Sequence, residues 1–294
     1  MLMLGQPAPT FSRIAVVFPP QMPEAAAEGR HVAQALRDLG TSHVIAAPIS
    51  NNELRAEMQT SGFDLLIALG GDGTMLRAVH LSAPQGVPVL GINFGHFGFL
   101  IEVQRENWRQ RLPDLLAGRF WVEERMMLTS EHWRAGQRLG SYQTLNEAVV
   151  ARGQIVRPIV VSAHIDGFEL TRYVADGLLV ATATGSTAYA LAVGGPIMPP
   201  ELRNMLIVAI APHLSVDRAV ILPEGAQVRL AVQTTHQAVL SVDGHPPVHL
   251  ENGDEVHVAA SDHTARFIRF EDRGYFYRNL TRYMQQNPST GETR

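Results

Sequence analysis

Hydrophobic positions in the first part of the chain form short continuous runs, separated by segments with helical spacing. Residues 13–18 (RIAVVF) and 63–69 (FDLLIAL) are such runs, whereas apolar residues recur at helical intervals over 24–39 and 74–81. Continuous runs of this length are typical of parallel strands buried on both faces by helices. Further elements are expected at 44–47 and 89–92 (strands) and at 51–60 and 102–118 (helices). The pattern predicts an α/β domain with a parallel sheet over residues 1–119.

From Phe120 onward most segments are strand-like, and at 228–232 and 256–258 the apolar positions alternate with a period of two, which is typical of half-buried strands. Asp166-Gly167 and Asn252-Gly253-Asp254 are hairpin turn signals. Strands are expected at 125–133, 143–150, 159–165, 168–174, 228–232 and 256–258. We therefore expect a β-rich domain over residues 120–268, followed by a carboxy-terminal segment, 269–294.

Composition narrows the class of protein. The chain has 294 residues, of which 46% are hydrophobic and 18% charged, as in ordinary globular proteins. Its net charge of -4 provides no basic surface for nucleic acid, and no apolar run is long enough to span a bilayer. The absence of cysteine excludes disulfides and thiolate chemistry, and it fits a reducing, cytoplasmic environment.

The chain also contains no lysine, because all 24 basic residues are arginine. A Walker-type phosphate loop, the strand lysine of protein kinases and Schiff-base chemistry are therefore excluded. If the protein handles phosphate, the phosphate charge must be met by Mg²⁺, backbone N–H groups and arginine.

A glycine-rich acidic loop, Gly70-Gly71-Asp72-Gly73-Thr74, follows the buried run at 63–69. Ligands of open α/β sheets bind at the carboxyl ends of the strands, where this loop lies. The glycines let the backbone approach a ligand closely, and N–H groups at the start of the next helix attract phosphate. Asp72 could hold Mg²⁺, accept a proton from an attacking hydroxyl or bind a ribose hydroxyl. It could also simply accept hydrogen bonds from the backbone of a strand-to-helix turn.

A second glycine-containing turn lies within residues 91–100 (GINFGHFGFL). Its spacing, G-x-x-x-G-x-x-G, is not the dinucleotide fingerprint G-x-G-x-x-G, which disfavours a standard Rossmann dehydrogenase. We expect Asn93 to face a ligand. The phenylalanines are expected to pack in the core: Phe94, Phe97 and Phe99.

Two polar stretches interrupt the strand pattern of the β-rich part. Asn146-Glu147 ends a strand with an amide and a carboxylate, which could bracket a ribose diol or be an ordinary strand-end polar pair. Residues 176–200 (DGLLVATATGSTAYALAVGGPIMPP) enter a cluster of small and hydroxylated side chains, with a helix expected from Ser186. Because bulky side chains are absent there, we expect contact with a ligand. Ser186 does not stand in a G-x-S-x-G elbow, so a hydrolase nucleophile is disfavoured.

Five histidines cluster within residues 236–263, in the last third of the chain, without the spacing of a zinc-binding motif. We expect them on solvated strand faces and predict no protein-held metal. They are His236, His245, His249, His257 and His263.

The ordered set of motifs resembles that of bacterial NAD kinases. The matching stretches are GGDGT at 70–74, GINFGHFGFL at 91–100, LNEAVV at 145–150, DGLLVATATGSTAYALAVGGPI at 176–197, APH at 211–213 with Arg218, and SVDG at 241–244. The resemblance spans about residues 12–280, and the stretch at 176–197 is its most specific part. GGDGT alone is shared with diacylglycerol and sphingosine kinases and, more loosely, with phosphofructokinases.

The resemblance implies an α/β amino-terminal domain, a β-rich NAD-binding domain and a carboxy-terminal segment that returns to the first domain. It implies phosphorylation of the 2′-hydroxyl of the adenosine ribose of NAD, with ATP and Mg²⁺ or another divalent cation, to give NADP and ADP. It also implies a homodimer or homotetramer.

Site residues are carried over position by position from this resemblance. Asp72 would accept the proton, with Gly71, Gly73 and Arg77 near the nucleotide. Asn146 and Glu147 would bind a ribose of NAD, and Asp176 would lie near its nicotinamide end. Further contacts with the dinucleotide are implied for Thr184, Thr187, Ala188 and Tyr189, with Arg157 as a weaker match and Ala192 in place of the family's usual serine.

Two alternatives belong to other classes. A lipid kinase of the diacylglycerol type would have an apolar entrance and no Asn146-Glu147 ribose pair. A dinucleotide-binding sensor without catalysis would bind NAD tightly without turning over ATP.

Overall fold

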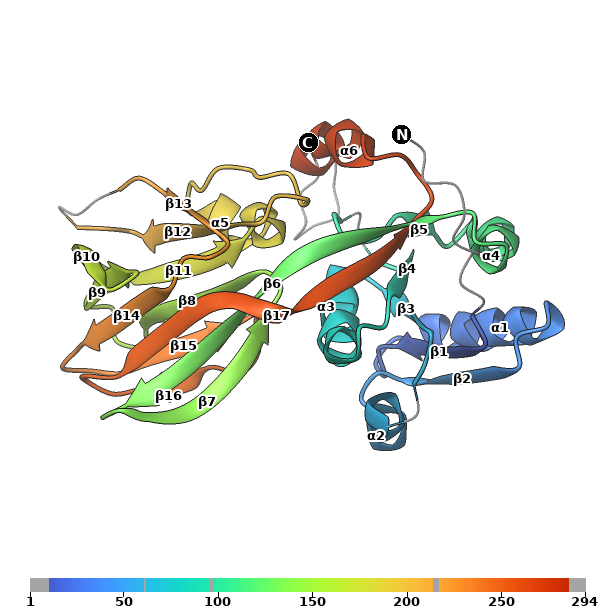
Figure 1. Ribbon diagram of the computed structural model, residues 1–294, viewed down its shortest axis with the longest axis horizontal. Coiled ribbons are helices and arrows are strands. Elements are labelled where there is room, and N and C mark those ends of the chain that lie inside the picture. The colour runs from blue at the N-terminus through green and yellow to red at the C-terminus, as the bar shows by residue number, and fades with distance from the viewer. Residues whose placement is uncertain (1–10, 61, 96–97, 214–216, 286–294) are drawn as a thin grey trace. The chain divides into compact units, whose positions relative to one another are not determined.

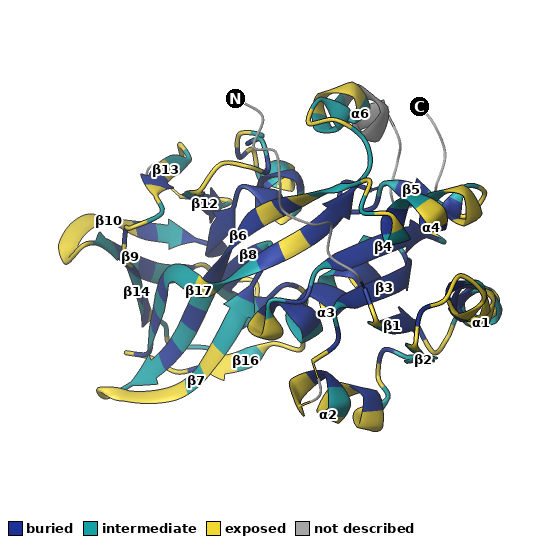
Figure 2. Ribbon diagram, turned by 45° about the vertical axis from the view of Figure 1, so that its right-hand side comes forward, coloured by how far each residue is buried: buried dark blue, intermediate teal, exposed yellow. Residues whose placement is uncertain are grey.

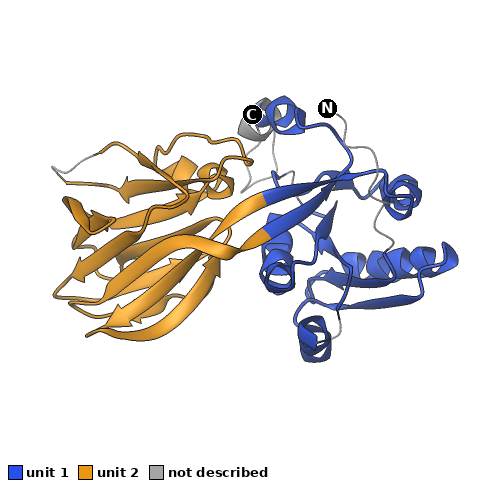
Figure 3. Ribbon diagram, viewed as in Figure 1, with its two compact units in different colours: residues 1–124, 265–294 blue, residues 125–264 orange. Residues whose placement is uncertain are grey.

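The computed structural model describes residues 11–60, 62–95, 98–213 and 217–285. The chain forms two compact units, one of residues 1–124 and 265–294 and one of residues 125–264 (Figure 3). It passes from one unit to the other within two long strands, β6 (Trp121–Arg134) and β17 (Glu255–Arg269). The sequence placed these boundaries after residues 119 and 268.

The first unit contains a parallel sheet in the spatial order β2, β1, β3, β4 (Figure 1). Its strands are β1 (Arg13–Phe18), β2 (His43–Pro48), β3 (Leu65–Gly70), β4 (Val89–Asn93) and the short β5 (Val103–Gln104). The end of β17 joins β4 in parallel, with Phe267 opposite Val89. The helices are α1 (Pro23–Asp38), α2 (Asn52–Thr60), α3 (Asp72–Ser82), the 3-10 turn η1 (Ala83–Gln85), α4 (Trp108–Leu116) and α6 (Tyr275–Gln285).

Strand β3 is buried along its whole length, as its continuous apolar sequence predicts (Figure 2). Ile67 and Leu69 pack in one cluster with Leu36 of α1 and Leu112 of α4. On neighbouring β4, a Cβ at Gly91 would lie 3.1 Å from the Sδ atom of Met75 in α3. Helices therefore cover the sheet on both faces, and the carboxyl end of β3 is left for the loop that follows it.

The helix expected over 102–118 is shorter than predicted, because α4 begins only at Trp108. The Glu102 carboxylate accepts hydrogen bonds from the backbone N–H groups of Phe270 and Glu271, at 3.0 and 2.7 Å. Val103 pairs with Ile92 as part of β5. These contacts with distant segments hold residues 102–104 extended.

Among the described residues, no helix is long and apolar enough to cross a membrane.

The second unit consists of antiparallel strands in two sheets (Figure 1). One sheet contains β10 (Phe168–Ala175), β9 (Ile159–Ile165), β14 (Val228–Gln233) and β17, to which β6 and β7 (Gln137–Thr144) are added. The other has the order β13 (Val220–Pro223), β12 (Asn204–Ile210), β11 (Gly177–Thr182), β8 (Glu147–Arg152), β15 (Ala238–Val242) and β16 (Val248–Leu250).

The two sheets of this unit share one hydrophobic core, in which Val150 and Val180 pack with Val161 and Leu230. The outer face of β11 is buried too, because Leu179 packs with residues of the segment at 183–198, among them Ala190. This second cover explains why β11 is apolar at consecutive positions although it belongs to an antiparallel sheet.

Candidate active site

The glycine-rich acidic loop joins the end of β3 to the start of α3. Gly71 is the N-cap of α3, and the helix begins at Asp72, two residues earlier than expected. The loop packs closely against the turn after β4: the N–H group of Phe94 donates to the Gly70 carbonyl oxygen at 2.9 Å, and a Cβ at Gly95 would lie 3.2 Å from the Cα of Gly71. A side chain at position 95 would therefore crowd the loop, whereas a Cβ at Gly71 would make only an ordinary contact with the Gly95 Cα, at 3.9 Å.

The Asp72 carboxylate is held by backbone donors from the turn after β4. The N–H group of Phe99 donates to Oδ2 at 3.0 Å, and that of Leu100 donates to Oδ1 at 3.3 Å. A Cβ at Gly98 would lie 2.2 Å from Oδ2, so only glycine permits this position of the carboxylate. Asp72 is half-buried, and its carboxylate is fixed in orientation at the carboxyl end of the sheet.

Arg77 and Gly73 lie one helical turn apart on α3, and both are exposed. The Nε–H group of Arg77 donates to the Gly73 carbonyl oxygen at 3.3 Å. Among the residues that the structure describes, none has a heavy atom within 4 Å of a Cβ placed on Gly73, at the start of the helix. The structure therefore brings Gly71, Asp72, Gly73 and Arg77 together around one helix start.

Asn93, which was expected to face a ligand, is largely buried and hydrogen-bonded within the first unit. It is 8% exposed, its Nδ2 group donates to Gln104 Oε1 at 3.1 Å, and its Oδ1 atom accepts from the Gly95 N–H group at 3.0 Å. Both ends of its amide are used to join β4, β5 and the following turn. Of the three phenylalanines assigned to the core, Phe94 packs against the core cluster of the first unit and Phe99 is buried. Phe97 lies outside the described residues.

In the second unit, the backbone at Asn146 and Glu147 is organised by an acidic residue, Asp243, that follows β15. Asp243 accepts hydrogen bonds from the N–H groups of Leu145, Asn146 and Glu147 at 2.7, 2.8 and 3.0 Å. Its own N–H group donates to the Glu147 carbonyl oxygen at 3.0 Å. Asp243 belongs to the sequence motif SVDG, which predicted no role for this residue. Its position before Gly244, with a φ of 49° typical of turn Asp and Asn residues, was the available signal.

The Glu147 side chain lies in an unusual environment for a carboxylate. It is 8% exposed, and its Oε2 atom is buried without a hydrogen-bond partner. Burial and the nearby charge of Asp243 raise the pKa of Glu147 to about 8, against the opposing effect of a hydrogen bond from the Tyr189 backbone N–H group. Glu147 is therefore mainly protonated at neutral pH, and its carboxyl group can donate as well as accept a hydrogen bond.

The segment after β11 is folded tightly against these residues. A Cβ at Gly185 would lie 2.1 Å from the Asn146 carbonyl oxygen, so a larger residue would displace the backbone. The Thr182 hydroxyl donates to the Leu145 carbonyl oxygen at 2.5 Å and accepts from the Gly185 N–H group at 3.1 Å. These hydroxyl contacts tie the segment to the strand end that carries Glu147.

The helix expected from Ser186 is a 3-10 turn, η2 (Thr184–Thr187), followed by a short helix α5 (Tyr189–Ala192). The Ser186 hydroxyl donates to the Ala183 carbonyl oxygen at 2.6 Å and accepts from the Met198 N–H group at 2.9 Å, which fixes the turn. The Oγ1 atom of Thr184 is buried without a partner, whereas the Thr187 hydroxyl donates to the Thr184 carbonyl oxygen at 3.1 Å. Ala188 is half-buried, and Tyr189 and Ala192 are exposed.

Asp176 and Arg157 have different surroundings. Asp176 lies just before β11 and pairs with Arg152 of β8, with Nε and Oδ1 3.0 Å apart. Arg157 is exposed, and its N–H group donates to the carbonyl oxygen of Ile155 in the same loop. The structure therefore groups Asn146, Glu147, Thr184 and Tyr189, and gives Asp176 an arginine partner.

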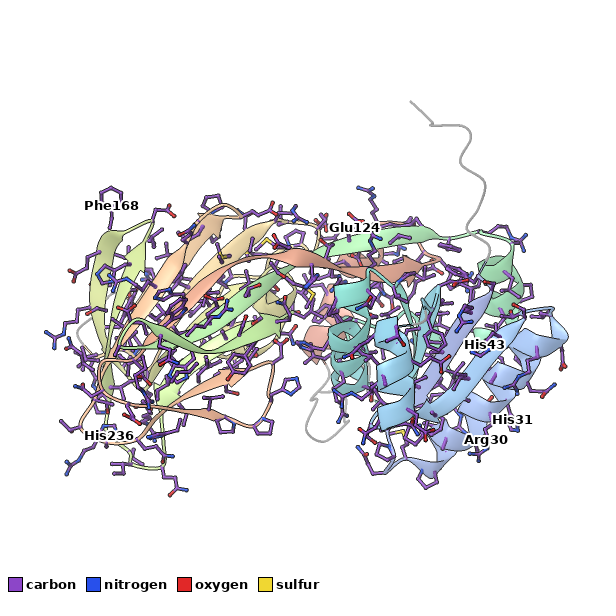
Figure 4. The ribbon with its side chains drawn as sticks, turned by 60° about the horizontal axis from the view of Figure 1, so that its bottom comes forward. Arg30, His31, His43, Glu124, Phe168 and His236 are labelled. Atoms are coloured by element: carbon purple, nitrogen blue, oxygen red, sulfur yellow. The ribbon has the colours of Figure 1, made fainter. Side chains whose placement is uncertain are left out.

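The five histidines within residues 236–263 are exposed or half-buried, and Figure 4 shows His236 on the outside of its unit. In the part of the chain that the structure describes, no three His, Cys, Asp or Glu side chains are grouped as they would be around a metal ion.

These features define a class of protein. The first unit has a glycine-rich acidic loop at the carboxyl end of a parallel strand, and the β-rich unit carries the polar pair Asn146 and Glu147. The chain has no lysine. This combination fits a kinase that uses neither a Walker loop nor a protein-kinase lysine.

Comparison with known proteins gives the family. The model of the ATP-NAD kinase N-terminal domain matches residues 14–120, and that of the C-terminal domain matches residues 145–270. An NAD kinase of Chloroflexus aggregans is 42% identical over 76% of this chain and 81% of its own length. One from Dehalococcoides mccartyi is 35% identical over 94% of this chain and 97% of its own length. The chain therefore belongs to the ATP-NAD kinase family, and it is an enzyme of that family.

Solved structures support the same assignment. Yeast NADH kinase complexed with NADH has a TM-score of 0.84 and 25% identity, covering 97% of this chain and 91% of the yeast chain. An NAD kinase from Archaeoglobus fulgidus in complex with ATP has a TM-score of 0.73 and 27% identity, covering 92% and 97%. The resemblance and the fold class expected from the sequence are confirmed, and the lipid-kinase and sensor alternatives gain no support.

Proposed function

We propose that the protein transfers the γ-phosphoryl group of ATP to the 2′-hydroxyl of the adenosine ribose of NAD, giving NADP and ADP. ATP would enter as its complex with Mg²⁺ or another divalent cation. The observation that carries this proposal is the Asp72 carboxylate, held by two backbone N–H groups at the carboxyl end of β3 and beside the start of α3. The complexes of the structural relatives with NADH and with ATP support the choice of substrates.

In the proposed reaction, the 2′-oxygen of NAD forms a bond to the γ-phosphorus, and the bond from that phosphorus to the oxygen bridging to the β-phosphate breaks. The hydroxyl proton passes to Asp72, and ADP leaves. The backbone of Gly71 and Gly73 at the start of α3 and the cation of Arg77 would lie near the nucleotide and meet its negative charge. Positioning and charge neutralisation, rather than covalent chemistry, would supply the rate enhancement.

NAD binding would fall to the second unit, where Asn146 and a protonated Glu147 would bind a ribose of NAD. A protonated carboxyl donates to one hydroxyl of the diol and accepts from the other, so no buried charge needs compensation. Asp176 would lie near the nicotinamide end. The remaining proposed contacts are Thr184, Thr187, Ala188, Tyr189, Ala192 and, as a weaker assignment, Arg157.

We further propose that the protein acts in the cytoplasm as a homodimer or homotetramer, without nucleic-acid or membrane partners. The absence of cysteine fits a reducing compartment. Large apolar side chains on the edge strands β10 and β13 support self-association: Phe168 is 80% exposed and points away from its strand (Figure 4), and Ile221 is 52% exposed.

The test is the purified protein incubated with ATP, NAD and Mg²⁺, with NADP measured by an NADP-specific dehydrogenase. We expect NADP to accumulate, and we expect chelation by EDTA to abolish its formation and excess Mg²⁺ to restore it. Diacylglycerol in place of NAD is the matched negative control. Failure to form NADP while ATP is consumed with the lipid would contradict the proposal.

A further inference from the structure

The first unit contains a buried ion pair that the proposed reaction does not use. Arg269 is the last residue of β17, and Glu123 lies in β6. Their side chains are joined by a hydrogen bond from Nε to Oε2 of 2.8 Å, and the two residues are only 5% and 9% exposed. Burying two charges is costly unless each finds good partners, so an ion pair in this position calls for an explanation beyond stability.

Arg269 has a second partner, in the turn that holds the acidic loop. Its Nη1 group donates to the Leu100 carbonyl oxygen at 3.0 Å. The N–H group of the same Leu100 donates to Oδ1 of Asp72, and the N–H group of the preceding Phe99 donates to Oδ2. The Arg269 guanidinium thus contacts Leu100, whose own N–H group binds Asp72 and which directly follows Phe99, the other donor to Asp72.

The same turn is tied to the end of β17 at further points. Glu102 accepts the N–H groups of Phe270 and Glu271, the two residues after Arg269. The Phe99 ring packs on the ring of Phe276, with centroids 5.5 Å apart. The turn that contacts Asp72 is therefore held by the end of β17 and the residues after it, and Arg269 supplies the cationic contact among these.

We propose that Arg269, held in place by Glu123, is a positioning residue for Asp72: it fixes the Leu100 carbonyl group, and thereby the two N–H groups that aim the carboxylate. This inference rests on the proposed role of Asp72 in phosphoryl transfer. Glycine at position 98 brings the carboxylate so close to this turn that a shift of the turn must move the carboxylate or break its hydrogen bonds. Misplacement of a reacting group by about 1 Å can lower a rate by roughly 100-fold.

The test must separate positioning from simple support of the fold. Removing Arg269 alone would take from buried Glu123 the charged partner that lies 2.8 Å away, so the informative variant is the double replacement Arg269→Met with Glu123→Met, which removes both members of the pair and keeps apolar volume. Glu123→Gln is the matched control, because its amide oxygen can still accept from Arg269 while Arg269 keeps its bond to Leu100. Each variant is assayed for kcat, for the KM of NAD and ATP, for thermal unfolding, and for amide hydrogen exchange of the segment at 98–101.

For the double variant we expect kcat to fall about 10- to 100-fold, with both KM values within about 3-fold of the wild type. We also expect at least about 10-fold faster exchange of the Phe99 and Leu100 amides, because the turn that carries them becomes mobile. For Glu123→Gln we expect kcat and exchange within about 3-fold of the wild type. A double variant with wild-type kcat, or with unchanged exchange at these two amides, would overturn the proposal.

If the double variant does not fold, Arg269→Lys carries the test, because it retains a charge opposite Glu123 but lacks the planar fork that reaches both partners. We expect it to fold with a lower kcat, and wild-type kcat in this variant would likewise overturn the proposal. Failure of the proposed function gives different results: the wild type would form no NADP, or Asp72→Asn would keep wild-type turnover. The exchange measurement does not depend on activity and reports on the hydrogen bonds in either case.

Discussion

Two acidic residues at strand ends, Asp72 in the first unit and Glu147 in the second, are held in opposite ways. Asp72 is half-buried, and each of its carboxylate oxygens accepts a backbone N–H group. Glu147 is 8% exposed, has one oxygen without a partner, and lies near the charge of Asp243, which raises its pKa to about 8 together with burial. The same chemical group is thus oriented in one unit and kept neutral in the other.

The difference comes from where the backbone donors go. In the second unit, three consecutive N–H groups donate to Asp243, and Glu147 receives only the N–H group of Tyr189. In the first unit, the donors of the turn at 99–100 go to Asp72 itself. This distribution suits a reacting group that must be oriented, and a buried binding group that carries no charge.

The largest effect is expected for Asp72→Asn. The amide cannot accept the hydroxyl proton, so we expect kcat for NADP formation to fall by roughly 10²- to 10⁴-fold, with NAD binding retained. Steady-state kinetics and calorimetric titration with NAD measure the two quantities. Asp38→Asn, an exposed replacement on α1, is the control and should match the wild type. Wild-type turnover by Asp72→Asn would remove the proton-accepting role.

The next effect is expected for Asp243→Asn. The variant keeps one oxygen acceptor but loses the charge that receives three N–H groups, so we expect a loss of about 1–3 kcal/mol in the free energy of unfolding. Because residues 145–147 lose their anchor, NAD affinity should fall by about 10-fold. Urea unfolding and calorimetric titration with NAD measure these changes. Unchanged stability and affinity would show that Asp243 does not organise the strand end.

The pH dependence of stability provides a more specific test through Glu147→Gln. The folded-state pKa of Glu147 is raised from 4.5 to about 8, so its proton is bound in the folded protein and released on unfolding between these values. The wild type should therefore lose stability as pH rises from 4.5 towards 8, with Glu147 contributing up to roughly 1.4 kcal/mol per pH unit. Glutamine does not titrate, so the variant should show a shallower slope. Equal slopes by urea unfolding at pH 5.5, 6.5 and 7.5 would contradict a neutral Glu147.

The smallest effect is expected for Ala192→Ser, which introduces the hydroxyl that the resemblance to bacterial NAD kinases implies at this position. Ala192 is exposed at the end of α5, so the added group should contribute at most about one ordinary hydrogen bond to NAD. We expect the KM for NAD to fall by no more than about 5-fold, with kcat unchanged. A change in kcat would contradict this prediction, because it would show that residue 192 affects phosphoryl transfer and not only NAD binding.

The sequence predicted the features that depend on residues close together in the chain, such as strands, helices and turns. The apolar run at 63–69 predicted a strand buried on both faces, and the glycine-rich acidic loop after it begins a helix as expected. Contacts between distant segments were not predictable from one sequence. Asp243 and Asn146 are 97 positions apart, and Arg269 and Leu100 are 169 apart. For the same reason, the predicted helix at 102–118 is longer than α4, which begins at Trp108. The hydrogen bond from Asn93 to Gln104 was likewise not predicted.

We propose that Asp72 of the first unit acts in phosphoryl transfer and that Asn146 of the second unit binds NAD. The most direct test measures kcat and the Kd for NAD in parallel for Asp72→Asn and Asn146→Ala. The account predicts that Asp72→Asn loses kcat and keeps the wild-type Kd, whereas Asn146→Ala weakens NAD binding and keeps most of kcat at saturating NAD. Loss of the same parameter in both variants, or a reversal of the two patterns, would contradict it.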